Sequence, residues 1–184
     1  GALQDYVFNF DGTNSFLTIP NSTDFDYGTG DFTWSFWLNV NSHVNFAGLF
    51  YFASVGAPYR LKIQTDSTIF LDAGNNDVQI SDLGSGLAGS GWHSLIFVRN
   101  SGTIITYLDG SQVDSVSYSH ALNSGGNDLI IGDNAGQYFN GSFSNISIWN
   151  AALTSSQVTE IYNSGKPANL NNHSAYSNLV SWWQ

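Results

Sequence analysis

The stretch Gly91–Gly110 reads GWHSLIFVRNSGTIITYLDG and predicts a β-hairpin. Its two apolar runs, Leu95–Val98 and Ile104–Leu108, flank the turn residues Asn100-Ser101-Gly102, and a second turn follows at Asp109-Gly110. Both runs carry apolar side chains at odd and even positions, so neither face of the hairpin can be left in water without cost. We therefore expect these runs to be central strands of a sheet, covered by the rest of the chain.

The length and composition are those of one folded domain spanning residues 1–184, long enough to bury a core without disulfides. Aromatic residues make up 15% of the chain and charged residues 10%, a composition that favours strands over disorder. The absence of cysteine removes thiol catalysis and thiolate metal sites. Because no apolar run approaches the roughly 20 residues of a membrane helix, we expect no membrane insertion.

The charge balance is strongly acidic, with four Lys and Arg residues against fourteen Asp and Glu and a formal net charge of -10. Nucleic acids and anionic lipids are bound through clustered Lys or Arg, which this chain cannot supply. We therefore expect no nucleic-acid partner. Neutral polar ligands and cations remain compatible with such a surface.

Hydrophobic patterning predicts about a dozen short strands and one late helix. The clearest alternation places Phe32, Trp34, Phe36, Leu38 and Val40 toward a core and Thr33, Ser35, Trp37 and Asn39 away from it. A capping box at Thr154–Gln157 predicts the start of a helix that ends before Gly165 and Pro167. The last strand, Leu179–Trp183, is expected to pair with the N-terminal strand. These elements are typical of an all-β antiparallel two-sheet sandwich, with a closed barrel as the alternative.

Six segments resemble a known family in their order and spacing. FNFDGTNSFLTIPN, DFTWSFWLNV, GWHSLIFVRNSGTIITYLDGSQV, LIIGDN, GSFSNISIWNAALTSSQVTEIYNSG and NLVSWW are similar to laminin G-like, concanavalin A-like jelly-roll domains over nearly the whole chain. The resemblance implies two curved sheets and, in many members, binding of carbohydrate or another ligand, often with Ca²⁺ at the rim. The tail IYNSGKPANLNNHSAYSNLVSWW resembles versions in structural proteins of marine bacteriophages. Where members commonly carry an acidic pair, Ser144-Asn145 stands here, which weakens a metal site inherited from that position.

Catalytic patterns are weak, and we expect no enzyme. Glycoside hydrolysis needs two facing carboxyl groups, but the only glutamate is Glu160 on the predicted helix, and most aspartates occupy turns. Ser-His-Asp triads are assembled in space and cannot be identified from sequence. His93 in the central hairpin is interpreted as a hydrogen-bonded structural residue. None of the histidines forms a metal-ligand pair in sequence: His43, His93, His120 and His173.

Calcium is the metal that the composition favours, because Asp, Asn and Gly turns supply the hard oxygen ligands that it prefers. Three groups of turn residues are candidate ligands: Asp11 with Asn14, Asp72 with Asn75 and Asp77, and Asp133 with Asn134. The alternative is that each group consists of ordinary turn residues, which have the same composition for backbone reasons.

Sugar binding would need an exposed aromatic ring with polar neighbours. Trp37 is a candidate because it lies on the polar face of its strand, and Tyr59, Tyr138 and Trp149 lie near loops or strand ends. The alternative for Trp37 is that it packs under a crossing loop.

Together these observations favour a non-enzymatic carbohydrate-binding or adhesion module of a larger surface or virion protein, with an extracellular or virion-surface location. Its expected partners are a glycan or cell-surface polysaccharide and other virion or surface proteins, with calcium as a candidate cofactor. The alternative is a purely structural module, such as a capsid-decorating or fibre domain. A degenerate hydrolase is the third possibility.

Overall fold

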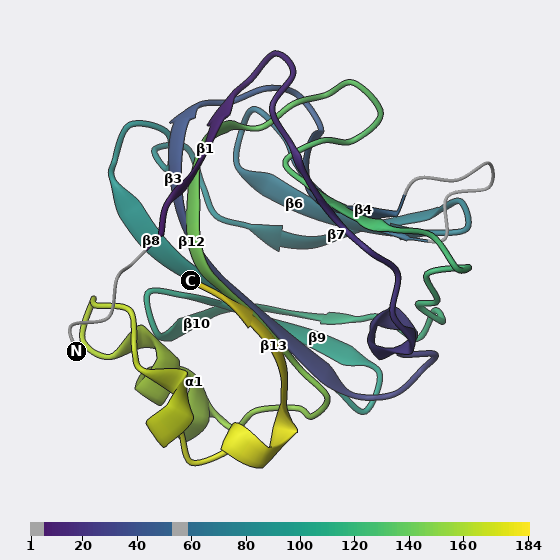
Figure 1. Cartoon of the computed structure of the whole chain (residues 1–184), viewed down its shortest axis with the longest axis vertical. Helices are drawn as coiled ribbons and strands as arrows, with labels where there is room; N and C mark the ends of the chain where they lie inside the picture. Colours follow the sequence, from purple (N-terminus) through teal and green to yellow (C-terminus); the bar gives the residue numbers. More distant parts are fainter. Residues whose placement is uncertain (1–5, 53–58) are drawn as a thin grey trace.

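Two antiparallel sheets packed face to face make up the computed structural model, which describes residues 6–52 and 59–184 (Figure 1). The seven-stranded sheet runs in the order β1 (Phe8–Asp11), β12 (Asn140–Trp149), β3 (Phe32–Ser42), β8 (Trp92–Asn100), β9 (Thr103–Leu108) and β10 (Ser111–Ser117), with β13 (Leu179–Trp183) also paired to β12. The six-stranded sheet runs in the order β2 (Leu17–Ile19), β11 (Leu129–Ile131), β4 (Ala47–Phe52), β5 (Arg60–Ile63), β6 (Thr68–Ala73) and β7 (Asn76–Asp82). The predicted all-β sandwich is confirmed.

The central hairpin forms as β8 and β9, joined by the turn Ser101-Gly102. β8 is paired to β3 on one side and to β9 on the other, and β9 lies between β8 and β10, so both are interior strands as predicted. Asp109 and Gly110 both have positive φ in the turn between β9 and β10. This turn places the carboxylate of Asp109 at the end of the sandwich, beside the start of β8.

The alternation predicted for residues 32–40 is confirmed by the main core, which fills the space between the sheets. Phe32, Trp34 and Phe36 are fully buried there, and the rings of Phe32 and Trp34 stack with centroids 4.2 Å apart. Thr33 and Ser35 point to the other face of β3 yet are also fully buried. The outer face of the seven-stranded sheet is therefore covered as well.

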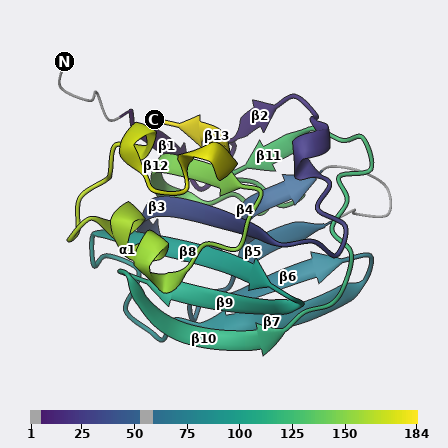
Figure 2. The same ribbon diagram turned by 90° about the horizontal axis from the view of Figure 1, so that it is seen from below.

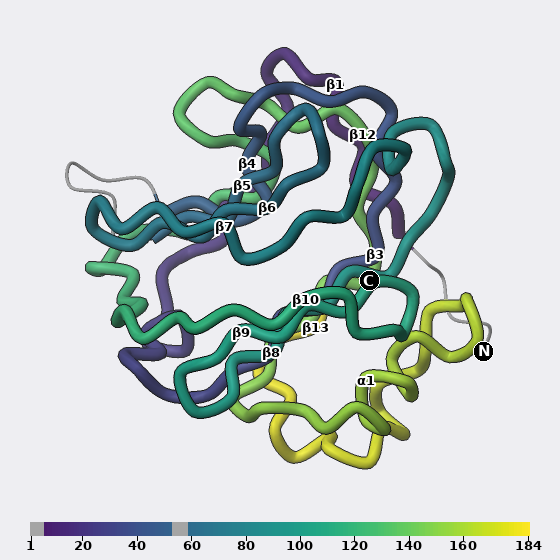
Figure 3. Tube along the Cα trace, turned by 180° about the vertical axis from the view of Figure 1, so that it is seen from behind, coloured from purple at the N-terminus to yellow at the C-terminus, as the bar shows by residue number. Residues whose placement is uncertain are grey.

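The cover is the helix α1 (Ser155–Tyr162) together with the C-terminal segment, which contains the short 3₁₀ helices η2 (Leu170–Asn172) and η3 (Tyr176–Asn178). A third 3₁₀ helix, η1 (Thr23–Phe25), lies near the N-terminus of the chain. Figure 2 shows α1 across the outer face of this sheet, and Figure 3 shows from behind that it lies outside the layer containing β8, β9 and β10. A second apolar cluster is buried beneath it, and its members are Ile96, Val98, Tyr107, Trp149, Leu153, Val158, Ile161, Leu170 and Ala175.

The pairing of the last strand differs from the prediction. β13 pairs with β12 at residues 146–149, whereas β1 pairs with the same edge of β12 at residues 140–143. Because β12 is ten residues long and β1 only four, this edge has room for both short strands end to end. Within the two described stretches of chain, no helix combines the length and the apolar character needed to cross a membrane.

Candidate functional site

A cavity of about 290 Å³ opens on the outer face of the seven-stranded sheet, beside the end of α1. We call it the Trp92 pocket, and it is lined by Val7, Trp37, Trp92, Ser144, Gly165 and Pro167. Three neighbouring strands carry its floor, because Trp37 of β3 lies opposite Ser144 of β12 on one side and opposite Ser94 of β8 on the other. The segment that follows α1 contributes one wall. None of these six described residues is charged.

Trp92 is the exposed aromatic residue of this pocket, with 40% of its surface accessible. It is the first residue of β8 and directly follows Gly91, whose φ of 99° ends the glycine-rich loop 84–91. In β8 it shares the outer face of the sheet with Ser94, so its ring stands next to the indole of Trp37 in the lining. Trp92 is not among the aromatic residues predicted from the sequence to bind sugar. The sequence feature that could have identified it is a tryptophan on the outward face of a strand that begins directly after a glycine-rich loop.

Trp37 lies in the pocket but is only 4% exposed, which corrects the expectation of an exposed ring. The cause is α1, because the ring of Tyr162 stacks on Trp37 with centroids 6.2 Å apart and planes 12° from parallel. A Cβ atom at Gly110 would come within 2.8 Å of Tyr162 Cδ1, so this glycine allows the helix to approach the sheet. The packing alternative for Trp37 therefore holds, with a helix in place of a loop. Its buried Nε1 has no hydrogen-bond partner within residues 6–52 and 59–184.

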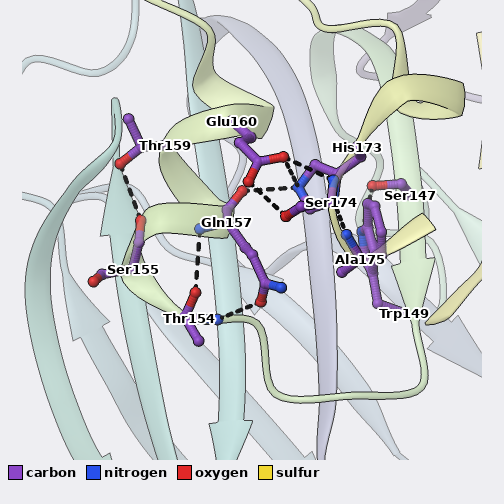
Figure 4. A network of polar contacts seen from close by, with 10 residues as sticks. All are labelled: Ser147, Trp149, Thr154, Ser155, Gln157, Thr159, Glu160, His173, Ser174 and Ala175. Carbon is purple, nitrogen blue, oxygen red and sulfur yellow. Dashed lines mark hydrogen bonds and ion pairs between the residues drawn. The ribbon is translucent and has the colours of Figure 1, made fainter. Parts of the chain in front are cut away.

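Polar contacts attach the C-terminal segment to α1 and so support the pocket wall (Figure 4). Glu160 accepts hydrogen bonds from Ser174, at 2.8 Å from the amide nitrogen to Oε2 and at 2.6 Å from Oγ to Oε1. These bonds, first that of the hydroxyl and then that of the amide, hold the pKa of Glu160 below its usual value. The only glutamate of the chain is thus engaged in structure.

His173 joins the same network from the segment before η3. Its Nε2 lies 2.9 Å from the carbonyl oxygen of Gln157, and its Nδ1 lies 3.0 Å from the amide nitrogen of Ala175. Because a carbonyl only accepts and an amide only donates, the neutral tautomer with the proton on Nε2 satisfies both partners. The imidazole also packs on Trp149, with ring centroids 4.6 Å apart.

Two of the three remaining predicted aromatic residues are buried. Tyr59 is 1% exposed and donates a hydrogen bond from its hydroxyl to the carbonyl oxygen of Phe25. Trp149 is fully buried in the second cluster. Tyr59 belongs to the core between the sheets, on the same face as Leu61 and Ile63, whereas Trp149 lies in the cluster beneath α1. Tyr138 is half-buried and stacks on the exposed Phe16, with centroids 6.4 Å apart.

Asp11, the first predicted calcium ligand, serves its own turn. Its Oδ1 accepts hydrogen bonds from the backbone amides of Thr13, Asn14 and Ser15 at 2.8, 3.0 and 3.2 Å. The amide of Asn14 and then that of Thr13 lower the pKa of this carboxyl, so it stays ionised. The arrangement is that of a turn stabilised by aspartate.

Cationic side chains occupy the second and third groups. Asp72 Oδ2 lies 2.7 Å from Arg60 Nη2, and Asp77 Oδ2 lies 2.8 Å from Lys62 Nζ. The same guanidinium reaches Asn134, whose Oδ1 lies 3.4 Å from Arg60 Nη1. Arginine therefore bridges the second and third groups where a calcium ion was expected, and these residues do not fit a metal site.

The last two predicted ligands also have turn functions. Asn75 takes a left-handed conformation in the exposed turn between β6 and β7, with φ of 74°. Asp133 Oδ1 accepts a hydrogen bond from the amide of Gly136 at 2.7 Å. In the described part of the chain, no three His, Asp or Glu side chains gather in a way that could hold a metal ion. Calcium binding stays a prediction.

Comparison with known proteins identifies relatives of this fold. Residues 11–159 match the family model of the concanavalin A-like lectin/glucanases superfamily. No curated protein matches the sequence. Domain 4 of AbnA, an extracellular arabinanase from Geobacillus stearothermophilus solved with arabinotriose, has a TM-score of 0.70 at 18% identity, over 88% of this chain and 78% of that one.

Two further solved structures show the same fold at lower TM-scores. A heptameric SAP-like pentraxin from Limulus polyphemus has a TM-score of 0.64 at 19% identity, over 89% of this chain and 85% of that one. A botulinum neurotoxin type C structure, described as interacting with two ganglioside molecules, has a TM-score of 0.61 at 11% identity, over 92% of this chain and 48% of that one. Identities this low show a shared fold.

Proposed function

The chain belongs to the concanavalin A-like lectin/glucanase superfamily, and from this premise we propose that it is a carbohydrate-binding module that binds its glycan without cleaving it, with the Trp92 pocket as the ligand site. The observation that carries the proposal is the exposed indole of Trp92 beside a cavity that reaches Trp37 and Ser144. A flat aromatic face stacks on the C–H face of a sugar ring, and a few polar groups nearby orient its hydroxyls.

The ligand class we propose is a neutral oligosaccharide. The pocket lining is uncharged, and the formal net charge of -10 repels acidic sugars at neutral pH. The AbnA domain solved with arabinotriose and the neurotoxin that interacts with gangliosides support glycan recognition by this fold. We place its action outside the cell, on the surface of a cell or a virion, where such oligosaccharides are presented.

The arrangement of the carboxylates supports binding of the glycan without cleavage. Glycoside hydrolysis uses two carboxyl groups that face each other across the scissile bond, about 5 to 10 Å apart. The lining of the Trp92 pocket contains none, and Glu160 is held by Ser174. A sugar in this pocket would therefore be bound without being cleaved.

The experiment is a glycan array followed by calorimetry with the best glycan on wild type, Trp92→Ala and Tyr176→Ala. Tyr176 is the matched control, because it is an exposed aromatic residue, 51% accessible, outside the pocket lining. We expect Trp92→Ala to weaken binding about tenfold or more, since an aromatic stacking contact contributes about 1 kcal/mol or more. Equal affinity in all three proteins, or binding to no glycan on the array, would overturn the proposal.

A calcium arm of the same experiment separates this pocket from the rim loops. Because the pocket offers no carboxylate, we expect the affinity to be unchanged in EDTA. Loss of binding in EDTA that is restored by calcium would move the ligand to the aspartate-rich turns and count against the Trp92 pocket.

The second candidate function is a structural module that packs against another protein. The observation that favours it is an apolar patch beside the edge strand β1, where Val7 is 45% exposed and Phe16 is 47% exposed and stacked on Tyr138. Exposed apolar patches mark protein contacts. Light scattering on wild type and Phe16→Ser tests this function: a defined oligomer that the substitution dissociates supports it, and a monomer over a wide concentration range argues against it.

A further inference from the structure

A second group of polar side chains lies on the other face of β8 from Trp92, around His93. Ser90 Oγ is 2.8 Å from His93 Nε2, and His93 Nδ1 is 2.7 Å from Asp109 Oδ2. Nucleophile, base and orienting carboxylate thus stand in the order that acyl-transfer enzymes use. We propose that Ser90 is a nucleophile activated by His93 and oriented through Asp109, and that it reacts with short-chain carboxylic esters. This activity goes beyond glycan binding and does not depend on it.

The three residues come from a loop, a strand and a turn. Ser90 lies in the glycine-rich loop 84–91, His93 is the second residue of β8, and Asp109 opens the turn after β9. His93 faces the inside of the sandwich, on the opposite side of β8 from Trp92. Two backbone contacts hold the carboxylate in place: Asp109 Oδ1 accepts a hydrogen bond from Ser94 N at 2.9 Å, and Asp109 N donates to Ser94 O at 2.8 Å.

Asp109 holds this position in a strained backbone conformation. Its φ of 50° lies in the left-handed region, which a residue with a side chain adopts at a cost. Aspartate is among the residues that adopt this region most readily, so the left-handed conformation alone does not indicate a function. The carboxylate, however, points to His93 and Ser94 and not to the amides of its own turn.

Proton positions follow from the partners. A carboxylate only accepts, so Nδ1 of His93 carries the proton toward Asp109, and the neutral ring leaves the lone pair of Nε2 for the hydroxyl of Ser90. Ser90 Oγ also lies 2.6 Å from the carbonyl oxygen of Leu87. The hydroxyl proton therefore has two acceptors within reach, and rotation from Leu87 O to His93 Nε2 prepares the serine for attack.

The surroundings favour a small apolar acyl group. Ser90 and His93 line a cavity of about 230 Å³ whose apolar walls are Leu83, Leu87 and Leu108. The residue Ser90 itself is exposed, so the alcohol portion of an ester can remain in solvent while its acyl chain contacts the leucines. We therefore assign short-chain esters as the substrate class and leave long acyl chains outside it, because a cavity of this volume cannot hold them.

The reaction balances with water as the only co-reactant. Ser90 Oγ attacks the carbonyl carbon of the ester and gives its proton to His93 Nε2. The bond from that carbon to the alcohol oxygen breaks, and the alcohol leaves with the proton from His93. Water then attacks the acyl group on Ser90 with His93 again taking a proton, and release of the carboxylic acid restores the serine.

The test uses a fluorophosphonate carrying biotin, which labels activated serines, and hydrolysis of 4-nitrophenyl butyrate. We expect peptide mass spectrometry to find the label on Ser90 in wild type, and we expect Ser90→Ala to lose it. His93→Gln should slow both labelling and hydrolysis about a hundredfold, the usual contribution of a positioned base. Asp109→Asn should slow them and alter the pH profile. Ser115→Ala, an exposed serine on β10, is the control and should react like wild type.

Thermal unfolding of every variant separates chemistry from folding. Ser90→Ala with a native melting temperature and no label supports the proposal. No label on Ser90 in folded wild-type protein would overturn it, and so would equal labelling in wild type and a folded His93→Gln variant. A variant of Ser90 that only lowers the melting temperature, with wild type unreactive, would show that the three residues merely hold the loop.

Discussion

Arg99 shows at the scale of one residue how this chain uses its few charges. Its side chain is fully buried, and its guanidinium donates hydrogen bonds to the carbonyl oxygens of Gly30, His120 and Gly28 at 2.7, 3.0 and 2.8 Å. The guanidinium carbon also lies 4.8 Å from the centre of the Phe32 ring. Burial lowers the pKa of Arg99 from its usual value. One cation therefore ties two loops to the central strand β8.

We predict that Arg99→Lys lowers the free energy of unfolding by about 3 kcal/mol or more. The three carbonyl oxygens are arranged around a planar guanidinium, so an ammonium group cannot reach all of them and is left partly unpaired in the interior. Urea denaturation measures the change. Arg60→Lys is the control, since its guanidinium side chain is 29% exposed beside Asp72 and should cost about 1 kcal/mol or less. Equal costs for the two substitutions would contradict this account of Arg99.

Single residues also show where sequence reasoning reached its limit. Alternation correctly assigned Trp34 to the core and Trp37 to the opposite face, because side-chain direction in a strand is a local property. That opposite face is covered by a helix more than a hundred residues later in the chain, so packing of Trp37 under a segment of chain could be offered as an alternative, but not the element that covers it. The pairing of Asp72 with Arg60 and the contact of His93 with Asp109 depend on the register between neighbouring strands, whereas the contact of Ser90 with His93 is local.

At the scale of elements, local signals predicted the helix and its boundaries well. The capping box forms as expected, with Thr154 Oγ1 accepting from the amide of Gln157 and Gln157 Oε1 accepting from the amide of Thr154. The central hairpin was equally predictable from its two apolar runs and turn residues. The partner of β13 could not be predicted in this way. The ten-residue edge of β12 can pair with either terminal strand, and it pairs with both.

The attachment of the C-terminal segment to α1 gives a prediction about pH. The pKa of Glu160 is lowered in the folded protein, so its hydrogen bonds to Ser174 stabilise the fold at pH values above the ordinary carboxyl pKa near 4.5, and this stabilisation is lost as the pH falls through the lower folded value. Glu160→Gln should therefore cost about 0.5 to 1 kcal/mol at pH 7 and less than that at pH 3. Urea titrations of both proteins at the two pH values measure this, and a pH-independent difference would contradict it.

At the scale of the whole molecule, the chain contains two buried clusters that share the seven-stranded sheet. The larger lies between the sheets, and the smaller lies between the outer face of the seven-stranded sheet and the α1 and C-terminal cover. The Trp92 pocket is built where this cover meets the sheet, since Gly165 and Pro167 belong to one and Trp37 to the other. Loosening the smaller cluster should therefore affect binding while the sandwich remains folded.

Leu170→Ala tests this coupling. Leu170 is 2% exposed in the smaller cluster, and the cavity left by the substitution should cost about 2 to 5 kcal/mol locally. We expect native-state hydrogen exchange to become faster in α1 than in β8 and the affinity for the glycan to fall. Leu71→Ala, fully buried in the larger cluster, is the matched control: it should lower global stability by a similar amount and leave the affinity of the folded protein unchanged. If both substitutions speed exchange in α1 and β8 alike, the two clusters unfold as one unit, and the pocket wall cannot open independently of the sandwich.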